Sequence, residues 1–121
     1  SLLYGAKTAR TLLFRPFLAD FPVSYRTDDG SFGQRGLVVD GLSREVDLVF
    51  ACGPEKMLER VALFYKDLPT EVYLSLEERM GCGTGICYGC ARKVRTDRGV
   101  EMVRVCEEGP VFEASRVVWD E

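Results

Sequence analysis

The chain has 121 residues, of which 46% are hydrophobic and 29% are charged, which suits one ordinary domain or two small ones. Its formal net charge is −3, so the composition gives no electrostatic support for binding nucleic acid. No apolar run approaches the roughly 20 residues of a membrane-spanning helix. There is no histidine, which excludes histidine-dependent triads, zinc sites with histidine ligands and haem sites with a histidine ligand.

The chain contains five cysteines, an odd number, and no basic start followed by an apolar stretch marks it for secretion. A disulfide framework is therefore disfavoured, and a metal or redox role in a reducing compartment, the cytoplasm, is expected. Because Ser1 leads at once into an apolar stretch, we expect the chain to be a C-terminal piece of something longer.

The first part of the chain reads as short apolar strands separated by helical and turn-rich segments. A helix-like apolar period runs through residues 8–20, although Pro16 is expected to kink or end it. The expected elements are strands at 2–6 and 22–27, a helix at 8–20, a turn-rich loop at 27–36 and a short helix at 37–42.

A strand–helix–strand unit follows, with strands predicted at 46–51 and 71–76 and a helix at 55–68. Pro54 suits the first helical turn, and Glu55 favours the positive end of a helix. The helix has one apolar stripe, formed by Met57, Leu58, Val61, Phe64 and Tyr65. Alternating strands and helices predict an α/β layer with a parallel sheet.

After about residue 76 the pattern changes to a cysteine-rich loop, two strands at 91–96 and 101–106 joined by a turn, and a tail at 109–119. This pattern predicts a small, mainly antiparallel β module. The expected fold class is therefore α/β, with a partial parallel-sheet nucleotide-binding domain at 1–76 and a second small domain at 77–121.

Four cysteines have the spacing Cys82-x4-Cys87-x2-Cys90, followed by Cys106 after fifteen intervening residues. This is the plant-type spacing of a [2Fe–2S] cluster, whose fourth ligand is expected to come from a distant strand. The glycines of this loop let the chain turn tightly and bring backbone N–H groups toward the sulfurs.

Two other readings of the cysteines remain open. A structural zinc site with four cysteines normally uses two CxxC knuckles, and here only Cys87 and Cys90 form one. A thioredoxin-type pair requires CxxC at a helix start, whereas this pair precedes a predicted strand. Cys52 lies outside the set.

A weaker signal is the turn Cys52-Gly53-Pro54, which joins a predicted strand to a helix N-terminus. Proteins with α/β sheets place ligands and anions at such turns. Any strand-to-helix loop looks like this one, so spacing alone leaves the question open.

Several stretches resemble a known family. "FACGPEKML", "LYGAKT" and "TDDGSFGQRGLV" resemble motifs of the ferredoxin–NADP reductase superfamily. "LEERMGCGTGICYGCARKV" and "RVCEEGPVF" resemble the [2Fe–2S] domain of the electron-transfer subunit of class B dihydroorotate dehydrogenase. The match covers essentially the whole chain.

The resemblance implies an NAD-dependent flavin and iron–sulfur oxidoreductase of pyrimidine biosynthesis. Its cluster passes single electrons between an FAD and the FMN of a separate catalytic subunit, in a heterotetramer. By motif match, the cluster ligands are Cys82, Cys87, Cys90 and Cys106. The residues expected to border the NAD site are Tyr4, Gly5, Ala6, Asp28, Asp29 and Gly30, with Cys52, Gly53 and Pro54 near the nicotinamide.

The family's FAD-binding barrel and the first strand and glycine-rich turn of its nucleotide domain are missing from the chain. We therefore expect the chain alone to bind a cluster, to be inactive, and to bind neither FAD nor NAD tightly. The sequence does not distinguish NAD from NADP.

Rival assignments are the related subunit of a sulfide dehydrogenase, an NAD(P)–ferredoxin oxidoreductase or a hydrogenase. In the sulfide dehydrogenase and NAD(P)–ferredoxin oxidoreductase group the first ligand is typically Asp, and Cys82 at that place favours the dihydroorotate enzyme. A zinc-stabilised interaction module is the non-enzymatic alternative.

Other residues have both a functional and an ordinary reading. The basic run of Arg92, Lys93, Arg95 and Arg98 could dock an acidic partner, but solvated strand and turn positions are favoured. For Trp119 we favour core packing over contact with a flavin or partner. Asp28 and Asp29 suit ribose hydroxyls and also ordinary turn chemistry.

Overall fold

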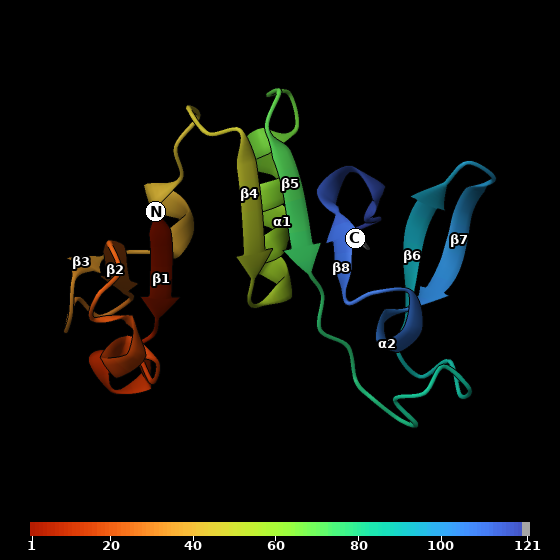
Figure 1. The fold of residues 1–121 in the computed structure, drawn as a ribbon, viewed down its shortest axis with the longest axis horizontal. Helices are drawn as coiled ribbons and strands as arrows, with labels where there is room; N and C mark the ends of the chain where they lie inside the picture. Colours follow the sequence, from red (N-terminus) through yellow and green to blue (C-terminus); the bar gives the residue numbers. More distant parts are fainter. Residues whose placement is uncertain (120–121) are drawn as a thin grey trace. The chain divides into compact units, whose positions relative to one another are not determined.

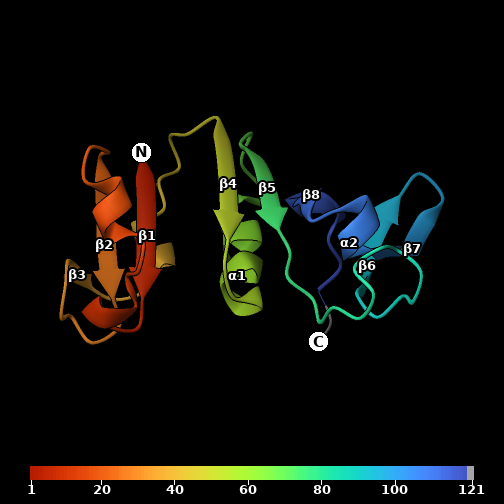
Figure 2. The ribbon, with the colours of Figure 1, turned by 60° about the horizontal axis from the view of Figure 1, so that its bottom comes forward.

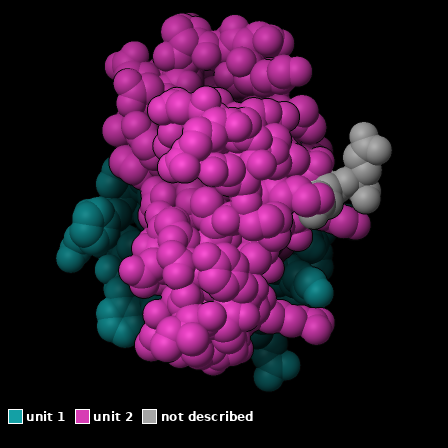
Figure 3. Space-filling view, turned by 90° about the vertical axis from the view of Figure 1, so that its right-hand side faces the viewer, with its two compact units in different colours: residues 1–43 teal, residues 44–121 magenta. Residues whose placement is uncertain are grey.

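The computed structural model describes residues 1–119. The chain divides into two compact units, residues 1–43 and residues 44–121, which Figure 3 colours teal and magenta. Each unit is described by itself. The fold class predicted from the sequence is confirmed, with parallel strand pairing around one α-helix and a small antiparallel hairpin.

The first unit contains a three-stranded parallel sheet (Figure 1). Strand β1 (Leu2–Ala6) pairs with β2 (Val23–Thr27), and β2 pairs with β3 (Gln34–Arg35). The short β3 lies within the segment predicted as a loop. It reaches the sheet through Gly33, where a side chain would place its Cβ 2.3 Å from the carbonyl oxygen of Tyr25.

The helix predicted at residues 8–20 is wrong. The segment forms two short 3₁₀ helices, η1 (Ala9–Thr11) and η2 (Arg15–Leu18), and a third, η3 (Val38–Gly41), replaces the short helix predicted at 37–42. In the first segment the side chains of Leu13, Phe14 and Phe17 are exposed. An apolar stripe stabilises a helix only when it is buried, so this pattern lacked the packing that a longer helix needs.

The second unit begins with the predicted strand–helix–strand. Strand β4 (Leu48–Cys52) and β5 (Glu71–Ser75) are parallel, and α1 (Glu55–Tyr65) connects them and packs on the sheet (Figure 2). Helix α1 ends three residues before the predicted bound. Of its apolar stripe, Leu58, Val61 and Tyr65 are buried, while Met57 and Phe64 are half-buried.

The C-terminal part starts with an antiparallel hairpin of β6 (Ala91–Thr96) and β7 (Gly99–Arg104). The strand predicted at 101–106 ends at Arg104, and a short helix α2 (Val105–Glu108) follows. Strand β8 (Val111–Glu113) then pairs antiparallel with β5, before η4 (Ala114–Arg116). The sheet of β4 and β5 therefore continues into the C-terminal segment, and the domain boundary between residues 76 and 77 stays a prediction.

The core of the second unit joins these elements. Leu58 of α1, Leu74 of β5, Val105 of α2 and Val117 are almost fully buried. The hairpin, the sheet and the helix therefore share one packed interior. Among the helices of residues 1–119, none combines the length and the apolarity that crossing a bilayer requires.

The buried leucine of β5 provides a test of this core. Leu74 is 0% exposed, and Leu74→Ala is expected to lower the free energy of unfolding by about 2–5 kcal/mol because it leaves a cavity. Leu63→Ala, at a side chain that is 61% exposed on α1, is the matched control and should change it by less than about 0.5 kcal/mol. Urea unfolding of both variants measures the difference, and equal losses would contradict this packing.

Candidate iron–sulfur site

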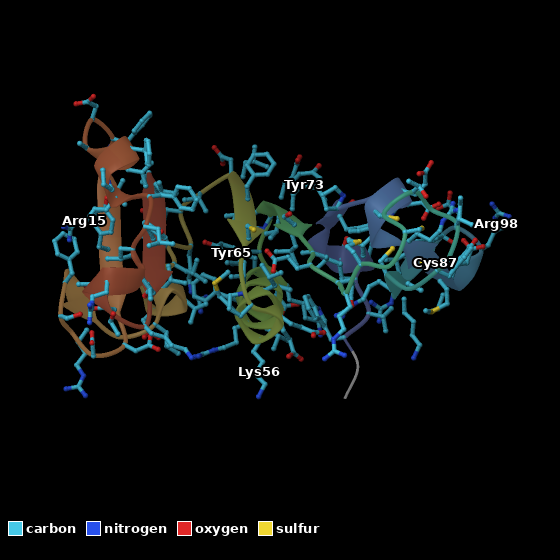
Figure 4. All side chains as sticks on the ribbon, turned by 90° about the horizontal axis from the view of Figure 1, so that it is seen from below. Arg15, Lys56, Tyr65, Tyr73, Cys87 and Arg98 are labelled. Carbon is cyan, nitrogen blue, oxygen red and sulfur yellow. The ribbon has the colours of Figure 1, made fainter. Side chains whose placement is uncertain are left out.

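The four cysteines lie in the connection between β5 and β6 and on α2. Residues 76–90 have no regular secondary structure, and Cys87, labelled in Figure 4, lies within this loop. The loop turns through Gly83 and Gly85, with φ of +69° and +79°, and through Tyr88, with φ of 57°. Glycine adopts such angles without steric cost, whereas tyrosine does so only under tertiary constraint.

Cys82 and Cys87 form the first pair of thiols. The backbone N–H of Cys87 donates to Sγ of Cys82 at 3.4 Å, and the N–H of Cys82 donates to Sγ of Cys87 at 3.4 Å. Gly89 N–H donates to Sγ of Cys87 at 3.3 Å. Both side chains are exposed at the surface of the loop. The loop backbone therefore wraps around this pair of sulfurs.

Cys90 and Cys106 form the second pair, although fifteen residues separate them. The hairpin places Ala91 opposite Arg104, and the N–H of Val105 donates to the carbonyl of Cys90 at 3.1 Å. The N–H of Cys106 then donates to Sγ of Cys90 at 3.5 Å. The prediction that the fourth cysteine comes from a strand is wrong in detail, because Cys106 lies on α2 immediately after β7.

The loop that carries the first pair lies against the start of the helix that carries the second, because Arg104 donates to the carbonyl of Gly85 at 2.6 Å. A hydrogen bond with Cys90 and burial raise the pKa of Cys106. Within residues 1–119, no group of three or more histidine, cysteine, aspartate or glutamate side chains is placed to hold a metal ion. The four thiols therefore form two separate pairs in this structure, on segments that touch.

Backbone and hydroxyl donors favour the thiolate at Cys82. The Thr84 hydroxyl, followed by the N–H groups of Thr84, Cys87 and Ile86, lowers the pKa of Cys82 to about 5. The N–H groups of Thr84 and Ile86 both lie 3.3 Å from its Sγ. The N–H of Cys106 likewise lowers the pKa of Cys90. Since the thiolate is the form that binds metals, these donors prepare the sulfurs as ligands.

Arg104 holds the loop against α2. Its guanidinium donates to the carbonyl of Gly85 at 2.6 Å and lies 5.0 Å from the ring centre of Tyr88. The same group pairs with both oxygens of Glu108, and that carboxylate raises the pKa of the arginine. One side chain therefore ties the turn between the first pair of cysteines to the helix that carries Cys106.

These observations test whether the residues fit a [2Fe–2S] cluster. Such a cluster has two irons and takes four cysteine thiolates, two on each iron. The structure provides two pairs of thiols and six N–H···S hydrogen bonds from the loop and α2. The donor set and its surrounding amides fit the cluster.

The residues expected to border NAD lie at the carboxyl end of the first sheet. Tyr4, Gly5 and Ala6 are on β1, and the turn Asp28–Gly30 follows β2. The N–H of Asp28 donates to the carbonyl of Ala6 at 3.1 Å, so the two stretches are adjacent. Asp29 accepts from the hydroxyl and N–H of Ser31, which lower its pKa, as in an ordinary aspartate turn.

The turn Cys52–Pro54 lies at the carboxyl end of β4, where Cys52 ends the strand and Pro54 precedes α1. Cys52 is exposed, so it is not a buried packing residue. It belongs to the second unit, and its role at a nicotinamide stays a prediction.

The basic run after the loop divides into buried and exposed members. Arg98 is 87% exposed at the end of the hairpin (Figure 4), and Lys93 and Arg95 are also exposed. Arg92 is buried and ion-paired, so the solvated position favoured for it from the sequence is wrong. Strand alternation was the available signal, because Arg92 shares its face with the buried Val94.

Sequence reasoning missed the contacts of Arg104 and Glu108. These residues stand four apart across the start of α2, a spacing that brings side chains together on a helix. The sequence suggested a strand there, and strand spacing does not pair them. The spacing of four residues between Arg104 and Glu108 was therefore overlooked, because a strand was predicted at 101–106.

Comparison with known proteins bears directly on this site. Residues 77–118 match the family described as the iron–sulfur cluster binding domain of dihydroorotate dehydrogenase B. The match includes the whole cysteine loop, the hairpin and α2.

Curated relatives extend the similarity to most of the chain. It is 42% identical over 112 residues to the electron-transfer subunit of dihydroorotate dehydrogenase B (NAD(+)) from Caldanaerobacter subterraneus, covering 90% of this chain and 45% of that protein. It is 44% identical over 97 residues to the same subunit from Streptococcus mutans, covering 78% of this chain and 37% of that protein. The resemblance drawn from the sequence is confirmed, and the chain spans less than half the length of these relatives.

The fold is also found in a solved structure of an NADH-dependent reduced ferredoxin–NADP oxidoreductase. The TM-score is 0.65 at 24% identity, and the match covers 98% of this chain and 53% of that one. This likeness confirms the ferredoxin reductase type of fold.

Gly81 provides a test of the sulfur geometry. A Cβ at Gly81 would lie 2.8 Å from Sγ of Cys87, so Gly81→Ala should displace that sulfur and give substoichiometric iron after anaerobic reconstitution. Gly83→Ala is the control, because no atom of residues 1–119 beyond Gly83 and its two chain neighbours lies within 4 Å of its Cβ, and its positive φ costs about 1 kcal/mol. Iron and sulfide assays compare the two, and full iron in Gly81→Ala would contradict the arrangement.

Proposed function

We propose that this chain is the cluster-bearing part of an electron-transfer subunit of an NAD-linked dihydroorotate dehydrogenase. It binds a [2Fe–2S] cluster through Cys82, Cys87, Cys90 and Cys106. The observation that carries the proposal is the arrangement of these thiols as two pairs, on segments that touch, with backbone amides aimed at their sulfurs.

Each pair has its own place in the proposed site. Cys82 and Cys87 would hold the cluster from the loop, and Cys90 and Cys106 would hold it from the hairpin and α2, because each pair is joined by N–H···S hydrogen bonds. When bound, the cluster supplies one-electron transfer between an NAD-linked flavin and a second redox partner. The loop amides stabilise the thiolates, and Arg104 holds the loop closed over α2.

The FAD and NAD sites belong to the longer protein. Tyr4, Gly5, Ala6 and the Asp28–Gly30 turn border the NAD site, which their adjacency at one sheet edge supports. Cys52, Gly53 and Pro54 lie near the nicotinamide, which the exposed position of Cys52 at the carboxyl end of β4 supports. The chain alone is inactive in this proposal because half of the flavin site is missing.

The partner that we propose is an FMN-containing catalytic subunit that oxidises dihydroorotate to orotate in pyrimidine biosynthesis, in a heterotetramer. The names of the curated relatives support a partner of this kind. We place the protein in the cytoplasm, because cysteines that bind an iron–sulfur cluster have to stay reduced and a reducing compartment keeps them so.

The rival redox assignment is the related subunit of a sulfide dehydrogenase, an NAD(P)–ferredoxin oxidoreductase or a hydrogenase. The likeness to the ferredoxin–NADP oxidoreductase structure extends to the fold alone. Cys82, where the sulfide dehydrogenase and NAD(P)–ferredoxin oxidoreductase group typically has Asp, favours the dihydroorotate enzyme. The remaining rival is a zinc-stabilised interaction module.

Metal content separates the cluster from the zinc module. Anaerobically purified chain should be brown and contain about two irons and two labile sulfides. Cys106→Ser should lose the four-cysteine spectrum, whereas Cys52→Ser, outside the ligand set, should keep it. A colourless protein with one zinc, or an unchanged spectrum in Cys106→Ser, would overturn the ligand assignment.

Nucleotide binding tests the missing half of the flavin site. Titration calorimetry of the cluster-loaded chain with NAD or FAD should give no saturable heat at micromolar ligand, because only part of each binding surface is present. Tight binding of either molecule would contradict the proposed partial site.

A further inference from the structure

Arg92 makes the most unusual set of contacts in the second unit. Its side chain is only 10% exposed, and Nη2 lies 2.6 Å from Oε1 of Glu55 while Nη1 lies 3.0 Å from Oε1 of Glu78. Its guanidinium carbon lies 5.4 Å from the ring centre of Trp119. Three segments far apart in sequence therefore meet on one side chain.

Arg92 is always charged, so its buried guanidinium needs the two carboxylates as partners. Glu55 and Glu78 supply opposite charges within 3.0 Å of its Nη atoms. Nε and Nη2 of the guanidinium have no hydrogen-bond partner among residues 1–119, so the Nη2–Glu55 contact is an ion pair without hydrogen-bond geometry, whereas Nη1 donates to Glu78. A buried charge without its partners is strongly destabilising, so the side chain can remain inside only while both carboxylates are held beside it.

The contacts of Arg92 connect the Cys52–Pro54 turn with the cysteine loop. Glu55 is the first residue of α1, directly after the turn Cys52–Pro54. Glu78 lies in the connector four residues before Cys82, and Arg92 lies two residues after Cys90 on β6. The ion pairs of Arg92 with Glu55 and Glu78, named the bridge below, therefore connect the turn expected near the nicotinamide with both ends of the cysteine loop.

We propose that Arg92 is a positioning residue that holds the cluster loop in register with the Cys52–Pro54 turn. The inference rests on the proposed function and adds to it the element that sets the separation between the nucleotide-side turn and the cluster. Electron transfer between two centres requires a defined separation, and a single bridge that spans the connector supplies it. Planar arginine engages two carboxylates at once, whereas lysine presents a compact point charge.

The free thiol of Cys52 allows a direct test. With the four ligand cysteines protected by the bound cluster, a blue-emitting fluorophore is attached to Cys52, and the distribution of its distance-dependent quenching by the oxidised cluster is measured from its time-resolved emission. The wild-type chain should give a single narrow distribution of separations. Arg92→Met should lose the narrow distribution, and Glu55→Gln with Glu78→Gln should do the same.

Two controls separate positioning from general stability. Arg98→Met removes an 87% exposed arginine of the same basic run and should leave the distribution narrow. Leu74→Ala destabilises the core without touching the bridge, so it should lower the melting temperature yet keep the separation. A narrow, unshifted distribution in Arg92→Met at unchanged iron content would overturn the proposal.

Hydrogen exchange tests the bridge without any cluster. In the apo chain, Arg92→Met should accelerate amide exchange of Met57, Leu58 and Leu76, whose N–H groups donate to the carbonyls of Pro54 and Pro110, by roughly tenfold or more relative to the β1–β2 sheet, a change of about 1.4 kcal/mol. A chain that binds no iron but shows this acceleration refutes the proposed function alone. A chain that binds iron without it refutes the bridge alone.

Discussion

The register of the β6–β7 hairpin is the constraint on which the site depends. Ala91 pairs with Arg104, so the residues that flank the hairpin, Cys90 and Cys106, meet although they are distant in sequence. A one-residue slip in an antiparallel pair turns every side chain to the opposite face. Because the hairpin fixes two of the four sulfurs, the flexible loop has to place only Cys82 and Cys87, and it does so through hydrogen bonds from its own amides.

Strands β1, β2, β4 and β5 were predictable from short apolar runs, and so was the pairing of β4 with β5 across a helix. The 3₁₀ segments were not, because the period through Leu13, Phe14 and Phe17 indicates a helix only if those side chains are buried, and they are exposed. Strand β3 depends on the close approach of Gly33 to Tyr25, a tertiary contact that no local pattern reports. The local sequence pattern therefore predicted the elements whose apolar side chains pack against neighbouring elements.

The four cysteines that we propose as ligands could be selected from their spacing, because iron–sulfur chemistry constrains cysteine spacing directly. The residues that support the ligands follow from tertiary packing. Arg92 and Arg95 look alike in sequence, and only the burial of one strand face distinguishes them. Cys106 was predicted on a strand because its apolar neighbours resemble one, but Glu108 accepts the backbone N–H of Arg104 and turns the chain into α2. Both arginines are held by carboxylates: Arg92 by Glu55 and Glu78, and Arg104 by Glu108.

Because Arg92 and Arg104 are paired with carboxylates, the hydrogen bonds to the sulfurs come from backbone N–H groups. Arg92 is matched by two carboxylates and Arg104 by Glu108, so neither presents an uncompensated cation to the loop. The groups that lower the pKa of Cys82 are a hydroxyl and amides. Salt screens exposed charges over about 10 Å at 0.1 M, but it does not displace a donor at 3.3 Å from a sulfur. The lowered pKa of Cys82 therefore follows from the conformation of the loop, which Arg104 ties to α2 through the carbonyl of Gly85.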